Sequence, residues 1–203
     1  LKSGKIDPQM HLIPASERDM KKISSLKTPQ SALAVVHMPA WHWDYATISQ
    51  QLSIALDSLQ DPGNMGTIVR LADWFGIRHI FCSKDTVDIF NPKVVQATMG
   101  AISNVQVHYE HLPDMLQDIP KAENFQIYGA FQQGKPVYTT ALTPRGMLVL
   151  GNEGNGIRPE TEAFIPEKLS VPVFPGNQAF SESLNVAMAA AVIVSEFRRA
   201  FYG

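Results

Sequence analysis

The sequence predicts an α/β protein built around one mostly parallel sheet. From about residue 49 onward, short apolar runs alternate with amphipathic or capped segments, the pattern of repeated strand–helix–strand units. The 203 residues are 45% hydrophobic and 18% charged, close to the average of soluble globular domains. This length allows one full domain and a smaller appendage. We therefore expect a buried sheet with helices packed against it.

Six short apolar runs are predicted to form the strands. Each run is bounded by polar or turn-forming residues, as expected for strands buried in a sheet. In chain order the predicted strands cover residues 52–57, 79–83, 105–109, 124–131, 146–150 with Gly151 following, and 169–173.

Helices are predicted between these strands. The clearest covers residues 64–75, where apolar side chains recur at helical spacing, Asn64 can cap the start and Gly76 can end it. Two shorter helices are predicted over residues 91–100 and 113–119, each with a proline early in its sequence. These elements complete the alternation that the fold class requires.

The final helix is predicted to begin near Ser183, an N-cap candidate, and to run toward Phe201. Its apolar residues lie nearly all round the helix, so every side of it must be covered. The sheet can cover one side. We therefore expect a second copy of the chain to cover another, which makes the protein a homodimer.

Residues 1–45 read differently from the rest of the chain. They hold a polar helical stretch over residues 16–25 and a Trp41-His42-Trp43 cluster, and we predict that they are the tail of a preceding domain plus a linker. Residues 46–203 would form the main domain. Residues 1–30 carry six Lys and Arg side chains against three acidic ones, which a solvated helix face explains as well as a binding surface does.

Composition excludes several classes of protein and site. A net charge of −2 argues against a large basic surface, and a single cysteine, Cys82, cannot form an internal disulfide. A reducing, cytoplasmic location fits best. The longest uncharged apolar stretch, residues 186–194, is far shorter than the roughly 20 residues that span a bilayer, so we expect no membrane anchor. The histidines are scattered and no metal site is expected.

Three polar loops follow predicted strands, at the edge of a parallel sheet where ligands bind. The first runs from Asp61 to Asn64 and leads into a helix with Arg70; a capped turn with an Arg70–Asp73 pair on a solvated face is the alternative. The second, residues 148–157, places three glycines and Glu153 after a strand, in an order that is neither a dinucleotide fingerprint nor a phosphate loop.

The third loop lies within residues 171–191 and opens the final helix with Ser183 and Asn185. Taken alone, Ser183 could be an ordinary helix cap. Taken together and in this order, the three loops resemble the three motifs of the SpoU-type (TrmH-like) RNA ribose 2′-O-methyltransferases of the SPOUT superfamily. The resemblance covers residues 50–200, and residues 28–36 are similar to the end of that family's N-terminal RNA-recognition domain.

The resemblance implies a SPOUT fold: a sheet with helices on both faces and a C-terminal part threaded into a deep trefoil knot, which is rare among proteins. It also implies that the knot binds S-adenosylmethionine between apolar walls and backbone groups. The positions matching the family's cofactor contacts are Ala130, Phe131, Leu150, Gly151, Val171, Pro172, Leu184 and Asn185.

The resemblance assigns the reacting end of the site to Arg70. Because a guanidinium is normally an obligate donor, we expect Arg70 to hold the RNA phosphate and orient the 2′-hydroxyl rather than act as a base. Asn64, Glu153, Ser183 and Asn185 would fix Arg70 and the loops by hydrogen bonds. In dimeric relatives this arginine can serve the partner's cofactor.

The function that follows is methylation of a ribose 2′-hydroxyl in structured RNA, ribosomal RNA being favoured over transfer RNA because an N-terminal recognition remnant is present. The alternative of another class is a non-catalytic RNA-binding or ribosome-assembly factor on the same fold. A nucleotide-binding oxidoreductase would need a Gly-x-Gly-x-x-Gly run after the first strand, where the chain has Asp61-Pro62-Gly63-Asn64.

Overall fold

The computed structural model describes residues 11–24, 28–119, 125–175, 183–199 and 201. The chain divides into two compact units, residues 1–40 and 41–203, so the division lies five residues before the predicted boundary at residue 45. In the first unit the helix α1 (Glu17–Ile23) begins at Ser16, whose side chain forms a reciprocal capping box with Asp19. The first ten residues of the predicted N-terminal part lie outside the described residues.

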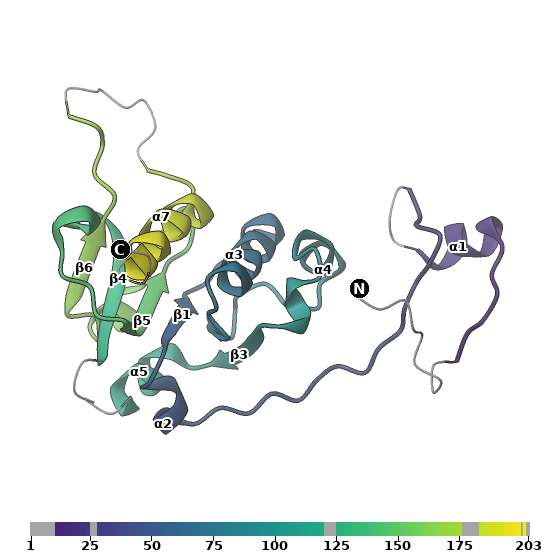
Figure 1. The fold of residues 1–203 in the computed structure, drawn as a ribbon, viewed down its shortest axis with the longest axis horizontal. Coiled ribbons are helices and arrows are strands. Elements are labelled where there is room, and N and C mark those ends of the chain that lie inside the picture. Colours follow the sequence, from purple (N-terminus) through teal and green to yellow (C-terminus); the bar gives the residue numbers. More distant parts are fainter. Residues whose placement is uncertain (1–10, 25–27, 120–124, 176–182, 200, 202–203) are drawn as a thin grey trace. The chain divides into compact units, whose positions relative to one another are not determined.

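The second unit is a six-stranded sheet in the order β3-β2-β1-β5-β4-β6, and every strand pairs in parallel with its neighbours (Figure 1). The strands are β1 (Leu52–Leu56), β2 (His79–Ser83), β3 (Gln106–Glu110), β4 (Phe125–Pro136), β5 (Arg145–Leu150) and β6 (Glu167–Ser170). The predicted parallel sheet is confirmed. All strands therefore end at one edge, the carboxyl edge, and begin at the opposite, amino edge.

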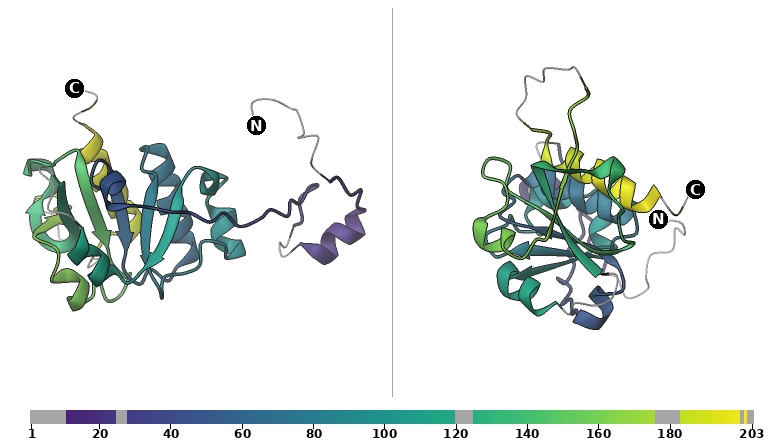
Figure 2. Two further views of the ribbon diagram at one scale, coloured as in Figure 1. Left: turned by 90° about the horizontal axis from the view of Figure 1, so that it is seen from below. Right: turned by 90° about the vertical axis from the view of Figure 1, so that its left-hand side faces the viewer.

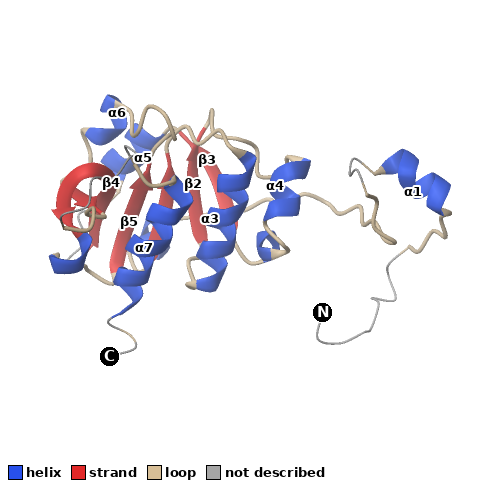
Figure 3. Ribbon diagram, turned by 90° about the horizontal axis from the view of Figure 1, so that it is seen from above, coloured by secondary structure: helices blue, strands red, loops and turns tan. Residues whose placement is uncertain are grey.

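Helices cover both faces of this sheet, as expected (Figures 2 and 3). One face carries α3 (Pro62–Trp74), α4 (Pro92–Ala97) and α7 (Val186–Arg199). The other carries α5 (Leu112–Asp118) and the short α2 (Tyr45–Ile48) and α6 (Pro159–Glu162). Successive residues of β1 enter different cores: Ile54 and Leu56 pack under α3 and α7, while Ala55 faces the other layer. The trefoil knot stays a prediction.

The boundaries differ from the predicted ones where tertiary contacts outweigh local pattern. Helix α3 begins at Pro62 because Asp61, not Asn64, is its cap. It ends at Trp74, and the predicted stop Gly76 follows the C-cap Phe75 with a φ of +66°. Strand β4 extends to Pro136 through a polar stretch, with an irregular register against β6 between Ala130 and Lys135; residue 124 of the predicted strand lies outside the described residues. The strand predicted over residues 169–173 lies slightly earlier in the chain, as β6 (Glu167–Ser170).

The Trp41-His42-Trp43 cluster belongs to the second unit, not to a linker. The Trp41 ring stacks on Phe90 with centroids 5.9 Å apart, and Trp43 packs edge-on against Phe81 at 5.0 Å. The Trp43 indole also donates to Glu110 Oε1 at 2.8 Å. These contacts place the start of the compact unit at Trp41, ahead of the first strand.

Candidate active site at the carboxyl edge

The first of the three loops is a rigid helix start. The Asp61 carboxylate accepts a hydrogen bond from the Asn64 backbone N–H at 2.7 Å, and Pro62 supplies the fixed φ of a first helical position. Strand β1 ends just before it, where the Asp57 N–H donates to the Leu150 carbonyl at 2.8 Å. The first loop is thereby tied to the end of β5, from which the second loop starts.

The Asn64 side chain joins all three loops. Its Nδ2 donates to Glu153 Oε1 at 3.0 Å, and its Oδ1 accepts from Asn185 Nδ2 at 2.9 Å. Glu153 Oε1 also accepts from the Asp61 N–H at 3.3 Å. Two residues that lie 89 and 121 positions after Asn64 in the sequence therefore both bind its side-chain amide. The structure brings together three of the five residues expected in the catalytic set.

Asn185 serves a second role as the cap of α7. Its Oδ1 accepts from the backbone N–H groups of Ala187 at 3.0 Å and Met188 at 3.3 Å. Asn185, and not the candidate Ser183, therefore caps the final helix, which begins three residues after Ser183. Ser183 is exposed and forms no hydrogen bond with the part of the chain that the structure describes. Since Asn185 can cap α7 and reach Asn64 at once, the helix starts at Val186.

The glycine-rich loop is a closed turn organised by Asn152. The backbones of Asn152 and Gly156 exchange two hydrogen bonds, and Asn152 Oδ1 accepts from the N–H groups of Gly154 and Asn155 at 2.9 and 3.1 Å. A Cβ on Gly151 would lie 2.2 Å from the Gly156 carbonyl carbon, so only glycine fits there. This turn presents Glu153 toward Asn64.

An ion pair between a buried carboxylate and a half-buried arginine, which no local sequence pattern predicts, anchors the same turn. Asp57 is fully buried at the end of β1, and it accepts from the Arg158 backbone N–H at 2.9 Å and from Nε at 2.8 Å. The hydrogen bond to Asp57 and its charge raise the pKa of Arg158, and burial opposes that rise. Such a pair holds its two segments in fixed register, since removing one partner would leave a buried charge unpaired.

Further polar contacts extend this anchor toward β2. Asp85 accepts from the Ser58 hydroxyl at 2.8 Å and lies 3.5 Å from Arg158. Hydrogen bonding, first to Ser83 and also to Ser58, lowers the pKa of Asp85, while burial acts in the opposite direction. Ser58 has a φ of +61°, a strained conformation for a residue with a side chain. The chain reverses there to bring α3 back over the sheet.

Arg70 lies on the exposed side of α3, together with Thr67 and Trp74 at helical spacing. Its guanidinium has no ion pair or hydrogen bond to any of the described residues. The alternative of an Arg70–Asp73 pair is wrong, because Asp73 instead accepts from Asn104 Nδ2 at 3.1 Å. The expected hydrogen bonds from the loops to Arg70 are also not formed. Arg70, without a partner among the described residues, lies on the same helix as Asn64, six residues later.

The predicted cofactor positions lie along the carboxyl ends of three adjacent strands. Ala130 of β4 is in register with Leu169 of β6, and Val171 follows two residues later. Leu150 is fully buried at the end of β5, and it shares one hydrophobic cluster with Ala130 and Val171. Apolar walls beside the backbone of a glycine turn suit an adenine ring and its polar edge.

The remaining cofactor positions differ in what they can offer. Phe131 packs in the cluster on the other face of the sheet, with Lys168 Nζ 4.9 Å from its ring centroid, so a cofactor contact would come from its backbone. Pro172 is exposed, and Leu184 is 52% exposed one residue before Asn185. The residues present therefore fit S-adenosylmethionine through side chains on one sheet face and through backbone at the turn.

Helices α3 and α7 are tied at both ends. Asn185 reaches Asn64 near their starts, and Arg198 Nε donates to the Phe75 carbonyl at 3.0 Å near their ends. The two helices consequently run side by side in the same direction across one face of the sheet (Figure 3). Their outer surface exposes Trp74 at 86% and Met188 at 60%. Trp74 is the last residue of α3 and Met188 lies in the first turn of α7, so the outer surface of these two helices, here called the apolar helix face, exposes a large apolar side chain at each end.

Three other features bear on the class of protein and site. Within the described ranges, no three His, Cys, Asp or Glu side chains lie close enough to hold a metal ion. Cys82 is buried, and burial raises the pKa of its thiol, so it is not a reactive nucleophile. No helix among the described residues has the length and apolarity needed to cross a membrane. The polar chemistry of the carboxyl edge is thus carried by amides, carboxylates and arginines.

Comparison with known proteins gives a consistent result. Residues 51–195 match the family model described as the SpoU rRNA methylase family. The 23S rRNA (guanosine(2553)-2′-O)-methyltransferase RlmP of Bacillus subtilis is 33% identical over 184 residues, covering 90% of this chain and 71% of that protein.

Solved structures agree with the sequence comparison. An RNA methyltransferase of the TrmH family from Porphyromonas gingivalis is 41% identical with a TM-score of 0.73, over 90% of this chain and 71% of that one. The AdoMet-bound rRNA methyltransferase of Sinorhizobium meliloti is 28% identical with a TM-score of 0.66, over 75% of this chain and 57% of that one. The residues that match the family model, 51–195, include Asn64, Glu153 and Asn185, the hydrogen-bonded cluster at the carboxyl edge.

Proposed function

Because the chain belongs to the SpoU rRNA methylase family, we propose that it transfers a methyl group from S-adenosylmethionine to a ribose 2′-hydroxyl of ribosomal RNA. The observation that carries the proposal is the joining of the three loops at Asn64, with Arg70 on the same helix unpaired with any of the described residues. Relatives named as 23S rRNA 2′-O-methyltransferases favour ribosomal over transfer RNA. The single buried cysteine is consistent with a cytoplasmic location.

The cofactor would be held at Leu150, Gly151 and Val171, with Ala130 and Leu184 completing the apolar walls. When bound, it supplies a methyl group on a positively charged sulfur, and that sulfur keeps the electron pair of the broken bond. The residues of this chain then have to bring the ribose oxygen in line with that methyl group. Holding two reactants in this geometry supplies a large part of the rate enhancement.

Arg70 would bind the phosphate next to the target ribose and orient its 2′-hydroxyl. A guanidinium presents a planar fork of donors that matches phosphate, and its high pKa makes it a poor base. The hydroxyl proton leaves as the new O–CH3 bond forms, and a phosphate oxygen held by Arg70 is the acceptor within reach of that hydroxyl. Asn64, Glu153 and Asn185 hold the loops in place during this step.

The test uses the 203-residue chain with isotopically labelled S-adenosylmethionine and unmodified ribosomal and transfer RNA. We expect ribose methylation of ribosomal RNA, read by mass spectrometry of the digested nucleosides. Methylation of a base instead of a ribose would overturn the proposed chemistry. Methylation of transfer RNA alone would show that the substrate is transfer RNA and not ribosomal RNA. Cofactor binding without any methylation would favour a non-catalytic RNA-binding factor.

We also propose that the active form is a homodimer that covers the apolar helix face. The tryptophan and the methionine exposed on these two adjacent helices are of residue types enriched at subunit interfaces. Sedimentation of the wild type and of Trp74→Ser tests this proposal. We expect a dimer for the wild type and a shift toward monomer for the variant, whereas a monomeric wild type at micromolar concentration would contradict it.

A further inference from the structure

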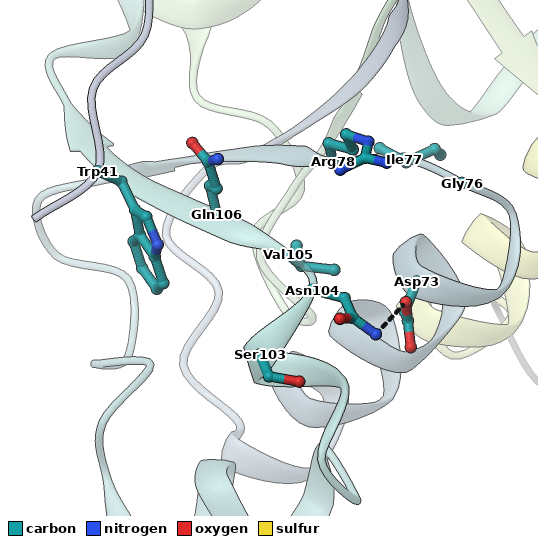
Figure 4. Close-up of a pocket in the computed structure, with 9 residues that line it drawn as sticks. All are labelled: Trp41, Asp73, Gly76, Ile77, Arg78, Ser103, Asn104, Val105 and Gln106. Atoms are coloured by element: carbon teal, nitrogen blue, oxygen red, sulfur yellow. Dashed lines mark hydrogen bonds between the residues drawn. The ribbon is translucent and has the colours of Figure 1, made fainter. Parts of the chain in front are cut away.

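A cavity of about 420 Å³ lies at the amino edge of the sheet, on the side opposite the candidate active site (Figure 4). Its volume is within the range of small-ligand sites. The walls come from the end of α3, the loop before β2, the segment before β3, and the start of the compact unit. The lining residues are Trp41, Asp73, Gly76, Ile77, Arg78, Ser103, Asn104, Val105 and Gln106.

Trp41 supplies an aromatic surface at one end of this cavity. The indole is half-buried and held by its stack on Phe90 and by an edge contact with His108, whose ring centroid is 6.5 Å away. A ring fixed in this way loses little freedom when a ligand stacks on the part that lines the cavity. Figure 4 shows Gln106 beside it, with Asp73 and Arg78 farther along the cavity.

The other end of the cavity carries groups suited to phosphate and to a base edge. Arg78 is exposed and has no ion pair or side-chain hydrogen bond to the described part of the chain. Asp73 Oδ1 accepts from Asn104 Nδ2 at 3.1 Å. Among the described residues, no hydrogen bond is made to Asp73 Oδ2 or to the side-chain oxygen of Asn104. Arg78 offers a cation, and Asp73 and Asn104 offer carboxylate and amide acceptors. The Gln106 amide lines the same cavity, together with the Trp41 ring.

We propose that this cavity binds one nucleotide of an RNA strand, several nucleotides away from the methylated ribose. The base stacks on Trp41, as single-stranded bases stack on aromatic side chains. Arg78 binds a phosphate of the same nucleotide, and the Asp73–Asn104 pair accepts hydrogen bonds from N–H groups on the base edge. The inference rests on the proposed function for the identity of the ligand as RNA.

Helix α3 connects this cavity to the candidate active site. Asn64 lies in its first turn at the carboxyl edge, Arg70 is on its exposed side, and Asp73 is near its end at the cavity. Thirteen helical residues span about 20 Å, which separates the two sites by several nucleotides. A nucleotide held so far from the reacting atoms contributes to RNA affinity and not to the chemical step.

The experiment compares Arg78→Gln and Trp41→Ala with Arg145→Gln in the 203-residue chain. Arg145 is an exposed arginine at the start of β5, on the same amino edge but outside the cavity, so it controls for lost charge. The probe is a fluorescein-labelled ten-nucleotide single-stranded RNA of mixed sequence, with binding followed by polarisation. Uridine 5′-monophosphate and uridine serve as competitors. Methyl transfer to ribosomal RNA is measured on the same samples.

We expect Arg78→Gln and Trp41→Ala each to weaken RNA binding and raise the KM for RNA about tenfold, with kcat unchanged. Arg145→Gln should change either value less than twofold. The slope of log affinity against log salt should become shallower by about 0.7 in Arg78→Gln, as one phosphate contact is lost. Uridine 5′-monophosphate should compete better than uridine. Because Trp41→Ala could loosen the packing on Phe90, Trp41→Phe should restore most of the binding.

Equal RNA affinity and salt slope in wild type and Arg78→Gln would overturn the inference, as would equal losses in Arg78→Gln and Arg145→Gln. A photocrosslink from 4-thiouridine RNA to the peptide containing Trp41 supports it, and crosslinks confined to other peptides contradict it. Failure of the two proposals is distinguishable. Normal methylation with an unchanged KM for RNA in the variants would reject nucleotide binding at the cavity but not the proposed function. RNA binding at the cavity without methylation would reject the proposed function but not the binding site.

Discussion

Polar side chains in the first turn of α3 are hydrogen-bonded, whereas the arginine on its exposed side, about two turns later, is not bonded to any described residue. At the first turn, both ends of the Asn64 amide are hydrogen-bonded to other loops, and Asp61 is bonded to the helix backbone. Six residues later, Arg70 has no partner within the described ranges. Polar groups that are bonded to one another hold the loops, whereas the unpaired group is available to a ligand.

The energies expected at the two places differ accordingly. Hydrogen bonds at an exposed edge stabilise a protein by about 1 kcal/mol each, and loss of one partner of a buried ion pair costs about 3–5 kcal/mol. An exposed, unpaired arginine contributes almost nothing to the free energy of unfolding. Changes in the bonded cluster should therefore be seen in both stability and activity, and changes at Arg70 in activity alone.

The largest expected effect is that of Arg70→Ala on methyl transfer. We expect kcat/KM for RNA to fall about a thousandfold, since loss of a preorganised donor at the reacting group typically has that size. The melting temperature and the affinity for S-adenosylmethionine should stay at wild-type values. Arg70→Lys keeps the charge but not the planar fork, and it should recover only part of the activity. A melting temperature several degrees lower in Arg70→Ala would show that this side chain is structural after all.

The next effect is that of Asp57→Ala on stability. Removing the fully buried carboxylate removes the acceptor of the Arg158 backbone N–H, Nε and Nη2 and leaves the guanidinium only its longer contacts to Asp85 and Glu160. Because hydrogen bonds to a charged group are lost, we expect the free energy of unfolding to fall by about 3 kcal/mol, measured by urea denaturation. Asp57→Asn keeps the shape and one acceptor and should lose less. Asp114→Ala on the exposed surface of α5 is the control, with a loss below about 0.5 kcal/mol. Equal losses in the free energy of unfolding in the Asp57 and Asp114 variants would show that the ion pair does not anchor the turn.

A smaller effect on both properties is expected for Asn64→Ala. The change breaks the bonds to Glu153 and Asn185 together but leaves the Asp61 cap intact. We expect kcat to fall about tenfold because the loops lose their common support, with about 1 kcal/mol lost in stability. Asn155→Ala, in the glycine turn, is the matched control. If kcat is unchanged in Asn64→Ala, the cluster does not position the site.

The sequence predicts the part of this site that depends on topology. The carboxyl ends of parallel strands meet at one edge, so polar residues after separate strands can be expected there, as Asn64, Glu153 and Asn185 are. The strand β2 over residues 79–83 has its predicted bounds because its apolar run is cut off sharply on both sides. In these cases the signal is local and the tertiary structure agrees with it.

The parts that were missed depend on side-chain partners far away in sequence. Asp57 and Arg158 are 101 residues apart, and both residue types are usually exposed, so nothing local marks them as a pair. Ser183 and Asn185 are both good caps, and only the bond from Asn185 to Asn64 decides between them. The helices α2 and α6 have four residues each, too few for a helical period to be recognised.

The histidines of β2 and β3 extend the comparison to bonded polar groups outside the candidate site. His79 Nδ1 and His108 Nε2 lie 3.1 Å apart, and both rings are buried. Both stack on Phe81, and His108 also packs edge-on against Trp43. Burial, and then the neighbouring histidines, lower the pKa of His108 from 6.5 to about 4; burial and Arg78 also lower that of His79. The native state therefore keeps these rings neutral where the unfolded state protonates them.

The smallest predicted effect follows from the sign of this linkage. The unfolded state binds more protons as pH falls below 6.5, so the stabilising contribution is complete above that pH and is lost toward about pH 4. Between pH 6.5 and 5 we expect the free energy of unfolding to drop by about 1 kcal/mol. His108→Phe should flatten this dependence, while His111→Gln on the exposed surface should leave it unchanged. An equally steep fall in His108→Phe would assign the acid sensitivity to other groups, and wild-type kcat in that variant would confirm that a bonded pair away from the carboxyl edge serves stability alone.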